Sequence, residues 1–356
     1  MQAAGDIKKA RRLTVDDYEA GIAAGNRTVL ARAITLIESQ ARAHEIQAQE
    51  ILRRVLPRTG GARRIGVSGA PGSGKSTFIE ALGCYLIDKG RKVAVLAIDP
   101  SSTISGGSIL GDKTRMDRLC QQANAFIRPS PAGGSLGGVA RRTRETMLLC
   151  EAAGFDTIII ESVGVGQAEV ALRSMVDYFL LLLLPGAGDE LQGIKKGIME
   201  IADGVLINKA DGENRLAAER ARLEQEGALG CLRPATPGWQ TTAGLCSART
   251  GEGVPAAWER IEAFYKELEP KGAIAARRRR QMLDWLADLV REGLLRDFYQ
   301  NPRVEKELPL MREAVLRGEM TAVQAAAALL AARRGDFKRQ ANDDDAPSRE
   351  RERPFR

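Results

Sequence analysis

Histidine and clustered cysteine are almost absent from this chain. It has one histidine, His44, and five cysteines among 356 residues, and no two cysteines form a CxxC pair. A zinc or nickel site made of clustered histidine and cysteine ligands is therefore excluded. Scattered cysteines in odd number are typical of reduced thiols in the cytosol. They are Cys84, Cys120, Cys150, Cys231 and Cys246.

Aromatic residues and long apolar runs are also scarce. Aromatics make up 4% of the chain and hydrophobic residues 44%, so the core is expected to be aliphatic. The apolar run Phe179–Leu184 has the length of a strand and falls well short of the roughly 20 residues of a membrane helix. No apolar segment follows the charges of Met1–Lys9, so no signal peptide is visible. We expect a cytoplasmic protein that does not bind a membrane.

The net charge of +7 and the isoelectric point near 9.3 raise the question of nucleic-acid or acidic partners. Most basic residues are interleaved with acidic ones. The compact basic run, Arg277–Arg280, has no interleaved aromatics on which bases could stack. We interpret it as a helix surface facing solvent or another subunit, and we expect no nucleic-acid partner.

The strongest motif is a phosphate loop at residues 69–77, which fits the pattern GxxxxGK[ST]. A buried strand, Arg64–Ser68, precedes it and a helical segment, Phe78–Leu86, follows, and this context disfavours an ordinary glycine turn. The glycines let backbone N–H groups converge on phosphate, and the helix N-terminus adds positive charge. Lys75 is predicted to reach the β- and γ-phosphates and Ser76 to ligate Mg²⁺. The predicted nucleotide contacts of the loop are Gly69, Ala70, Pro71, Gly72, Ser73, Gly74, Lys75, Ser76 and Thr77.

Four further aliphatic segments alternate with helical stretches. This alternation predicts an α/β fold, a P-loop NTPase with a mostly parallel sheet flanked by helices. Polar motifs follow these segments, at the carboxyl ends of strands, where open α/β sheets bind ligands. The predicted strands are residues 92–99, 155–161, 178–184 and 204–208.

Helical segments flank the predicted α/β domain. Thr14–Asp17 resembles a helix-capping signal, and apolar residues recur at helical spacing as far as Leu56. Helical patterns resume after residue 272, and from Asp336 the tail is charged and expected to be disordered. The expected organisation is a helical extension at 1–60, a P-loop domain at 61–270, a helical arm at 271–335 and a tail at 336–356.

A guanine-reading element follows the fourth of these strands. In Asn208-Lys209-Ala210-Asp211, the Asp211 carboxylate can accept hydrogen bonds from the N1–H and the exocyclic amino group of guanine. Adenine lacks this donor pair, so ATP is expected to be rejected. Asn208 is expected to brace the loops, and the Lys209 stem can lie on the base. Ser247-Ala248-Arg249 fits the short loop whose N–H groups contact the guanine oxygen, with ordinary turn residues as the alternative.

Carboxylates also follow the predicted strands. Glu161-Ser162-Val163-Gly164 resembles the DxxG element of GTPases with glutamate for aspartate. Glu161 can hold Mg²⁺ through water or orient the attacking water, and the Gly164 N–H can sense the γ-phosphate. Asp99 and Asp112 are further candidate acids near the metal. For Asp112, a helix-capping aspartate is the alternative.

Together these motifs resemble a known family. The residues Asp99–Ser102, Gly111–Met116 and Glu161–Gln167 take part, and the stretch Gly188–Gly197, GDELQGIKKG, is the most specific. Over about Thr14–Ala332 the chain is similar to the methylmalonyl-CoA mutase-associated GTPases of the MeaB/ArgK type, which sit among the metallochaperone P-loop GTPases.

The resemblance implies a GTP-hydrolysing chaperone for an adenosylcobalamin-dependent acyl-CoA mutase of the methylmalonyl-CoA mutase type. Such a protein gates delivery of the cobalamin cofactor and protects or reactivates the mutase. It implies GTP, GDP and Mg²⁺ as cofactors and a homodimer formed through the C-terminal helical arm. An adenosyltransferase is a further candidate partner.

The resemblance also implies roles for individual residues. Gly188–Gly197 would be a mobile loop that couples the partner to the nucleotide, with Gln192 and Lys195 as its candidates, and a loop that merely packs is the alternative. The implied catalytic residues are Lys75, Asp112, Glu161 and Lys195. The implied metal ligands are Ser76, Asp99, Asp112 and Glu161.

Three alternatives come from other functional classes. A metal-insertion GTPase would carry cysteine or histidine ligands between the phosphate loop and Glu161, where only Cys84, Cys120 and Cys150 occur, widely separated. A kinase or ATPase for basic amino-acid transport conflicts with the guanine-reading element. A nucleotide-gated binding module with negligible turnover stays open, because intrinsic GTPases can be slow without a partner.

Overall fold

A parallel sheet forms the centre of this computed structural model, which describes residues 13–39, 41–98, 116–129, 136–162, 167–186 and 197–334. Within these residues seven strands pair in the order β3-β2-β4-β1-β5-β6-β7, and every neighbouring pair is parallel. The predicted fold class is confirmed. The strands are β1 (Arg63–Gly69), β2 (Val93–Ile98), β3 (Ala125–Arg128), β4 (Thr157–Ser162), β5 (Tyr178–Leu183), β6 (Gly204–Ile207) and β7 (Ala243–Leu245).

The long central strands are the ones that the sequence predicted. Strands β1, β2, β4, β5 and β6 are buried almost throughout, as continuous aliphatic runs covered on both faces should be. The edge strands β3 and β7 have four and three residues and were not predicted. Segments this short carry no periodic pattern, and only their pairing with β2 and β6 defines them.

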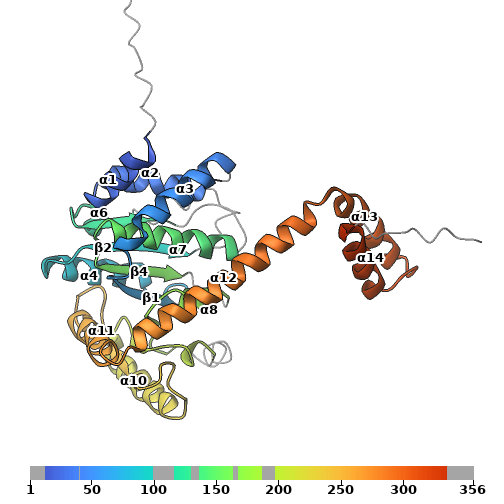
Figure 1. Cartoon of the computed structure of the whole chain (residues 1–356). Coiled ribbons are helices and arrows are strands. Elements are labelled where there is room, and N and C mark those ends of the chain that lie inside the picture. Colours follow the sequence, from blue (N-terminus) through green and yellow to red (C-terminus); the bar gives the residue numbers. More distant parts are fainter. Residues whose placement is uncertain are drawn as a thin grey trace, which may run out of the picture. The chain divides into compact units, whose positions relative to one another are not determined.

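Helices cover both faces of the sheet (Figure 1). On one face, α4 (Lys75–Asp88) and α11 (Val254–Leu268) build an aliphatic and aromatic core with the central strands. The other face carries α7 (Leu136–Ala152) and α8 (Gln167–Arg173). Leu172 of α8 approaches the sheet so closely that a Cβ at Gly66 of β1 would lie 2.9 Å from its Cγ. Helix α10 (Arg215–Gly230) lies along β6 and β7.

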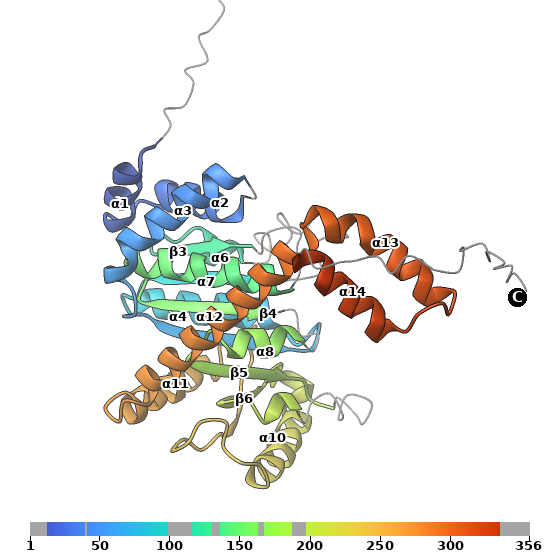
Figure 2. The ribbon, with the colours of Figure 1, turned by 45° about the vertical axis from the view of Figure 1, so that its right-hand side comes forward.

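Three helices precede the sheet: α1 (Val15–Ala23), α2 (Arg27–Glu38) and α3 (Arg42–Val55). Thr14 and Asp17 form the capping box at the start of α1, so the predicted capping signal is confirmed. The apolar stripes of the three helices meet one another, and α2 and α3 pack on α7 (Figure 2). Helical packing of the N-terminal segment therefore extends the core beyond the sheet.

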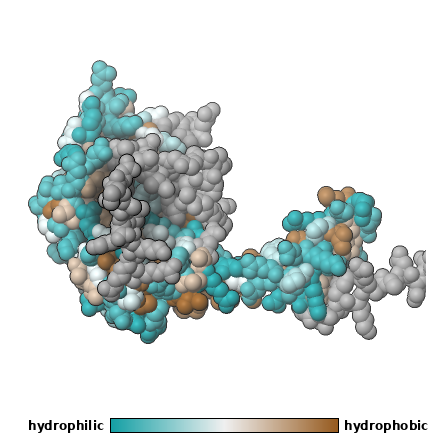
Figure 3. All heavy atoms as spheres, turned by 90° about the horizontal axis from the view of Figure 1, so that it is seen from above, coloured by the Kyte–Doolittle hydropathy of each residue, from teal (hydrophilic) through white to brown (hydrophobic). Residues whose placement is uncertain are grey.

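The chain divides into two compact units, Met1–Gln281 and Met282–Arg356, and α12 (Ala273–Tyr299) crosses their boundary. In the second unit, α13 (Pro302–Leu316) and α14 (Ala322–Arg334) pack against each other. Large apolar side chains stay exposed on this pair, and they appear as brown patches in Figure 3. Among the described residues, no helix is long and apolar enough to cross a membrane.

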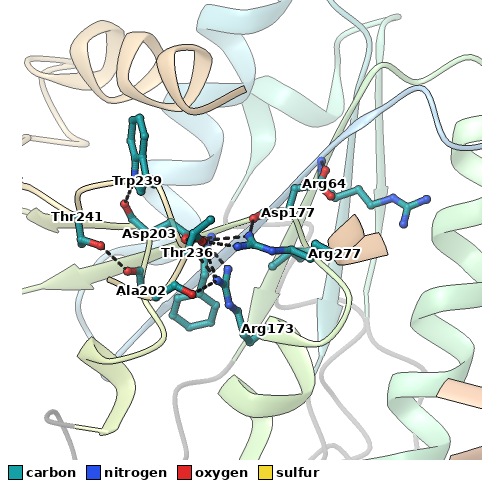
Figure 4. A network of polar contacts seen from close by, with 12 residues as sticks. Arg64, Arg173, Asp177, Ala202, Asp203, Thr236, Trp239, Thr241 and Arg277 are labelled. Atoms are coloured by element: carbon teal, nitrogen blue, oxygen red, sulfur yellow. Dashed lines mark hydrogen bonds and ion pairs between the residues drawn. The ribbon is translucent and has the colours of Figure 1, made fainter. Parts of the chain in front are cut away.

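Ion pairs with buried carboxylates anchor the N-terminal part of α12. Arg278 donates to Asp177 through Nε at 2.8 Å and through Nη2 at 2.6 Å. Arg277 donates to Thr236, and its Nη1 lies 3.6 Å from Asp203 (Figure 4). The prediction that the basic run faces solvent or another subunit is wrong for these two arginines. Their partners Asp177 and Asp203 are buried carboxylates that lie far from the basic run in the sequence, and buried carboxylates require cations as partners.

Candidate functional site

The phosphate loop joins β1 to α4 at the carboxyl end of the sheet. Gly74 precedes the first helical residue with φ of 87°, a left-handed conformation that glycine adopts without strain. A Cβ at this position would lie 2.5 Å from Nδ2 of Asn208. Gly72 also has positive φ, at 78°. The glycines therefore permit a turn tight enough for backbone N–H groups to face one anion.

Lys75 begins α4 and is buried with 8% of its surface exposed. Its Nζ donates to the carbonyl oxygens of Gly69 at 2.8 Å and Ala70 at 3.2 Å. Burial lowers the pKa of the ammonium, while the carboxylates of Glu161 and Glu169 act in the opposite direction. A cation held among loop carbonyls and near two carboxylates is suited to contact a polyphosphate.

Ser76 and Glu161 meet at the same edge. The Ser76 hydroxyl donates to Oε1 of Glu161 at 3.0 Å. Glu161 lies on β4, which pairs with β1 on one side and β2 on the other. A hydroxyl and a carboxylate are the hard oxygen donors that Mg²⁺ prefers, so this pair fits a magnesium site. The next residue of the loop, Thr77, is exposed in the first turn of α4.

Asn208, at the end of β6, links the two halves of the candidate nucleotide site. Its Nδ2 donates to the carbonyl oxygen of Ser73 in the phosphate loop at 2.7 Å. Its Oδ1 accepts from the Ala248 backbone N–H at 3.0 Å. Lys209 follows in a left-handed conformation, with φ of 61°. This amide therefore sets the distance between the phosphate loop and the segment of Ala248.

Asp211 and Ser247 come together, although 36 residues separate them. The Ser247 hydroxyl donates to Oδ1 of Asp211 at 3.0 Å, and Nε of Arg249 donates to Oδ2 at 3.0 Å. The hydrogen bonds from Arg249 and Ser247 lower the pKa of Asp211. A carboxylate kept ionised in this way can accept the two donors of a guanine edge.

Five predicted site residues lie outside the described residues, and their roles stay predictions. They are Asp99, Asp112, Gly164, Gln192 and Lys195.

One polar side chain at this edge was not predicted. Glu169 of α8 is 1% exposed, and its Oε1 accepts from the Ser68 hydroxyl of β1 at 3.4 Å. No motif marks this residue. The available signal was an acidic residue between the apolar residues Ala168 and Val170, shortly after the Glu161 element.

Comparisons with known proteins point in one direction. The family model described as "Methylmalonyl Co-A mutase-associated GTPase MeaB" matches residues 30–303. A protein of Caulobacter vibrioides described as "Putative GTPase" is 53% identical over 320 residues, covering 90% of this chain and 98% of that protein. The mouse protein "Methylmalonic aciduria type A homolog, mitochondrial" is 46% identical over 328 residues, covering 89% of this chain and 79% of its own length.

Among solved structures, one described as an LAO/AO transport system kinase superposes with a TM-score of 0.72 at 35% identity. It covers 90% of this chain and 97% of its own. The residues that the family model matches, 30–303, include the strands of the sheet, the phosphate loop and the segments of Asp211 and Ser247.

Proposed function

The chain belongs to the family of methylmalonyl-CoA mutase-associated GTPases, and we propose that it uses GTP turnover to assist an adenosylcobalamin-dependent acyl-CoA mutase. Its fold and family make it a P-loop GTPase. The proposal concerns the client, the magnesium ion and the coupling between them. The family match over residues 30–303 is the observation that carries it.

The geometry of the nucleotide site supports GTP and GDP as ligands. Asn208 ties the phosphate loop to the segment of Ser247 and Ala248, so a single nucleotide can contact both. Asp211 reads the base, and Lys75 with the loop N–H groups stabilises charge on the transferring phosphoryl group. When bound, Mg²⁺ would neutralise the β- and γ-phosphates, with Ser76 and Glu161 as ligands.

Further residues complete this site in the proposal. Asp99 and Asp112 assist at the metal, and the Gly164 N–H senses the γ-phosphate. Gln192 and Lys195 belong to the segment that communicates with the mutase. Loss of the γ-phosphate changes the contacts of these residues and thereby the grip on the partner.

An exposed apolar stripe on α12 supports a homodimer. Leu283 is 67% exposed, Leu286 57%, Val290 53% and Leu294 58%, and their spacing places them along one side of the helix. Helix–helix association is the ordinary way to bury such a stripe. Light scattering should find a dimer for the wild type and a monomer for Leu286→Glu/Val290→Glu. A monomeric wild type would contradict this part of the proposal.

The mutase partnership is tested with purified acyl-CoA mutases. The wild-type protein with GTP should slow inactivation of the mutase during turnover, and the mutase should in turn accelerate GTP hydrolysis. Lys75→Ala, which removes the phosphate-contacting ammonium, should abolish both effects. Arg53→Ala is the control, because among the described residues Arg53 pairs with Glu50 on the surface of α3. The same assays are repeated with an adenosyltransferase, the second candidate partner.

The alternative of a kinase for basic amino-acid transport predicts a different nucleotide and acceptor. The guanine-reading carboxylate favours GTP, and Asp211→Asn should move the preference from GTP toward xanthosine triphosphate. An unchanged preference, or equal binding of ATP by the wild type, would overturn the base assignment. Phosphate transfer to arginine or ornithine without any effect on a mutase would favour the kinase.

A further inference from the structure

A buried polar cluster lies behind the Ser76–Glu161 pair. Val67 of β1 and Glu161 of β4 are register partners. The next residues, Ser68 and Ser162, therefore point to the opposite face of the sheet, which α8 covers. The Ser162 hydroxyl donates to Oγ of Ser68 at 2.9 Å, and the Ser68 hydroxyl donates to Oε1 of Glu169. We call Ser68, Ser162 and Glu169 the serine–glutamate cluster.

The side chain of Glu169 has few hydrogen bonds for a group buried so deeply. Its bond from Ser68 is long, at 3.4 Å, and its Oε2 is buried without a hydrogen-bond partner among the described residues. Burial raises its pKa, while the hydrogen bond from Ser68 and the nearby charge of Lys75 act in the opposite direction. An unpaired buried carboxylate oxygen destabilises a fold, so stability alone would favour an apolar side chain here. Side chains that lower the stability of a fold are typical of functional sites, where activity needs them.

The cluster connects the strands that carry the two sides of the phosphate site. Ser68 directly precedes Gly69 of the phosphate loop, and Ser162 directly follows Glu161. Glu169 holds the Ser68 hydroxyl, which in turn accepts from Ser162. The Ser162–Ser68 bond ties the end of β4 to the end of β1. The Glu169–Ser68 bond joins α8 to β1 and orients the Ser68 hydroxyl that accepts from Ser162, so the two bonds together fix Glu161 relative to Ser76.

We propose that Glu169 is a positioning residue for GTP hydrolysis, acting through Ser68 and Ser162 to hold the Glu161 carboxylate at the phosphate loop. This inference rests on the role given to Ser76 and Glu161 under the proposed function. It predicts that Glu169 contributes to turnover and little to nucleotide binding or to stability.

Glu169→Met tests this, because methionine has a similar length and removes the acceptor. Single-turnover GTP hydrolysis should slow about tenfold, the equivalent of one hydrogen bond. The Kd for GDP measured in EDTA, where Glu161 has no metal to hold, should stay within about twofold. The midpoint of thermal unfolding should stay equal or rise. Glu169→Gln keeps Oε1 as an acceptor and should recover most of the rate.

A double-mutant cycle tests the route through the serine. Ser68→Ala should slow hydrolysis by a similar factor, and Ser68→Ala/Glu169→Met should be no slower than the slower single variant. Additive losses would overturn the proposed route. A lower unfolding midpoint with an unchanged hydrolysis rate in Glu169→Met would show that the residue is merely structural.

The matched control is Glu145→Gln on α7. Glu145 is also buried, with a pKa that burial raises, but it accepts hydrogen bonds from Gln49 and Arg141. In Glu145→Gln, GTP hydrolysis should keep the wild-type rate. The unfolding midpoint should fall or stay unchanged. Loss of GTP binding in the wild type would refute the proposed function, whereas intact hydrolysis in Glu169→Met would refute this inference alone.

Discussion

The two ends of the sheet contain buried charges arranged in opposite ways. At the amino end, Asp177 receives hydrogen bonds from Arg278, from the hydroxyl of Tyr265 at 2.9 Å and from the backbone N–H of Arg64 at 3.1 Å. At the carboxyl end, the ammonium of Lys75 rests on loop carbonyls, and Glu169 has an oxygen without a partner among the described residues.

This difference separates charges that hold the fold together from charges kept for a ligand. A fully hydrogen-bonded buried ion pair leaves no capacity for a further partner, so its loss is felt as stability. A group with capacity to spare can bind a phosphate or a metal, at some cost to stability. The amino end should therefore respond to substitution in unfolding measurements, and the carboxyl end in nucleotide measurements.

The largest expected effect is at the amino end. Asp177→Asn leaves Arg278 buried without its counter-ion, and the free energy of unfolding should fall by about 3–5 kcal/mol. Denaturant titration measures this change. Asp288→Asn is the control, because Asp288 forms an exposed ion pair with Arg291 and should not alter stability measurably. If Asp177→Asn weakened GDP binding with stability intact, the contrast between the two ends would be wrong.

Next in size is Lys75→Ala at the carboxyl end. Removing one donor that stabilises transition-state charge should slow GTP hydrolysis by about 10²–10³-fold. Because the ammonium is buried and has no carboxylate hydrogen-bonded to it among the described residues, the unfolding midpoint should not fall. Single-turnover hydrolysis and thermal denaturation measure the two quantities. A large fall in the midpoint would assign Lys75 a structural role.

Asn208→Ala should affect both quantities, because Asn208 joins two loops of the site. It leaves the Ser73 carbonyl and the Ala248 N–H without their partner, at about 1–3 kcal/mol. We expect a lower unfolding midpoint and weaker GDP binding together. Calorimetry on the folded variant measures the affinity. A change in stability with the affinity intact would mean that the bridge does not position the nucleotide.

Arg249→Ala should have the smallest effect. Its side chain is 80% exposed, so its pair with Asp211 is screened by water and adds little to stability. Loss of the pair lets the pKa of Asp211 rise toward its ordinary value. Asp211 then takes up a proton at a higher pH. When the pH is lowered, the GDP affinity of the variant should therefore begin to fall at a higher pH than that of the wild type. Identical pH profiles would show that Ser247 alone sustains the low pKa.

The sequence predicted those parts of the site that lie within one segment. The phosphate loop of residues 69–77 is local, since glycine, lysine and serine spacing together with a strand and a helix suffice to specify it. The Asp211 element was equally recognisable for this reason. The prediction that Arg277 and Arg278 lie on the surface was wrong because their partners, Asp177 and Asp203, are far away in the sequence, each just before a strand.

By itself, then, the amino-acid sequence determined the α/β class, the long buried strands and the motifs for phosphate and guanine, because each depends on neighbours along the chain. The bracing role of Asn208 was also predicted. Only the tertiary structure decided that β3 and β7 complete the sheet, which loop atoms Asn208 contacts and that Glu169 lies beneath Ser68. These features depend on which strand pairs with which, and pairing brings together residues whose spacing carries no pattern.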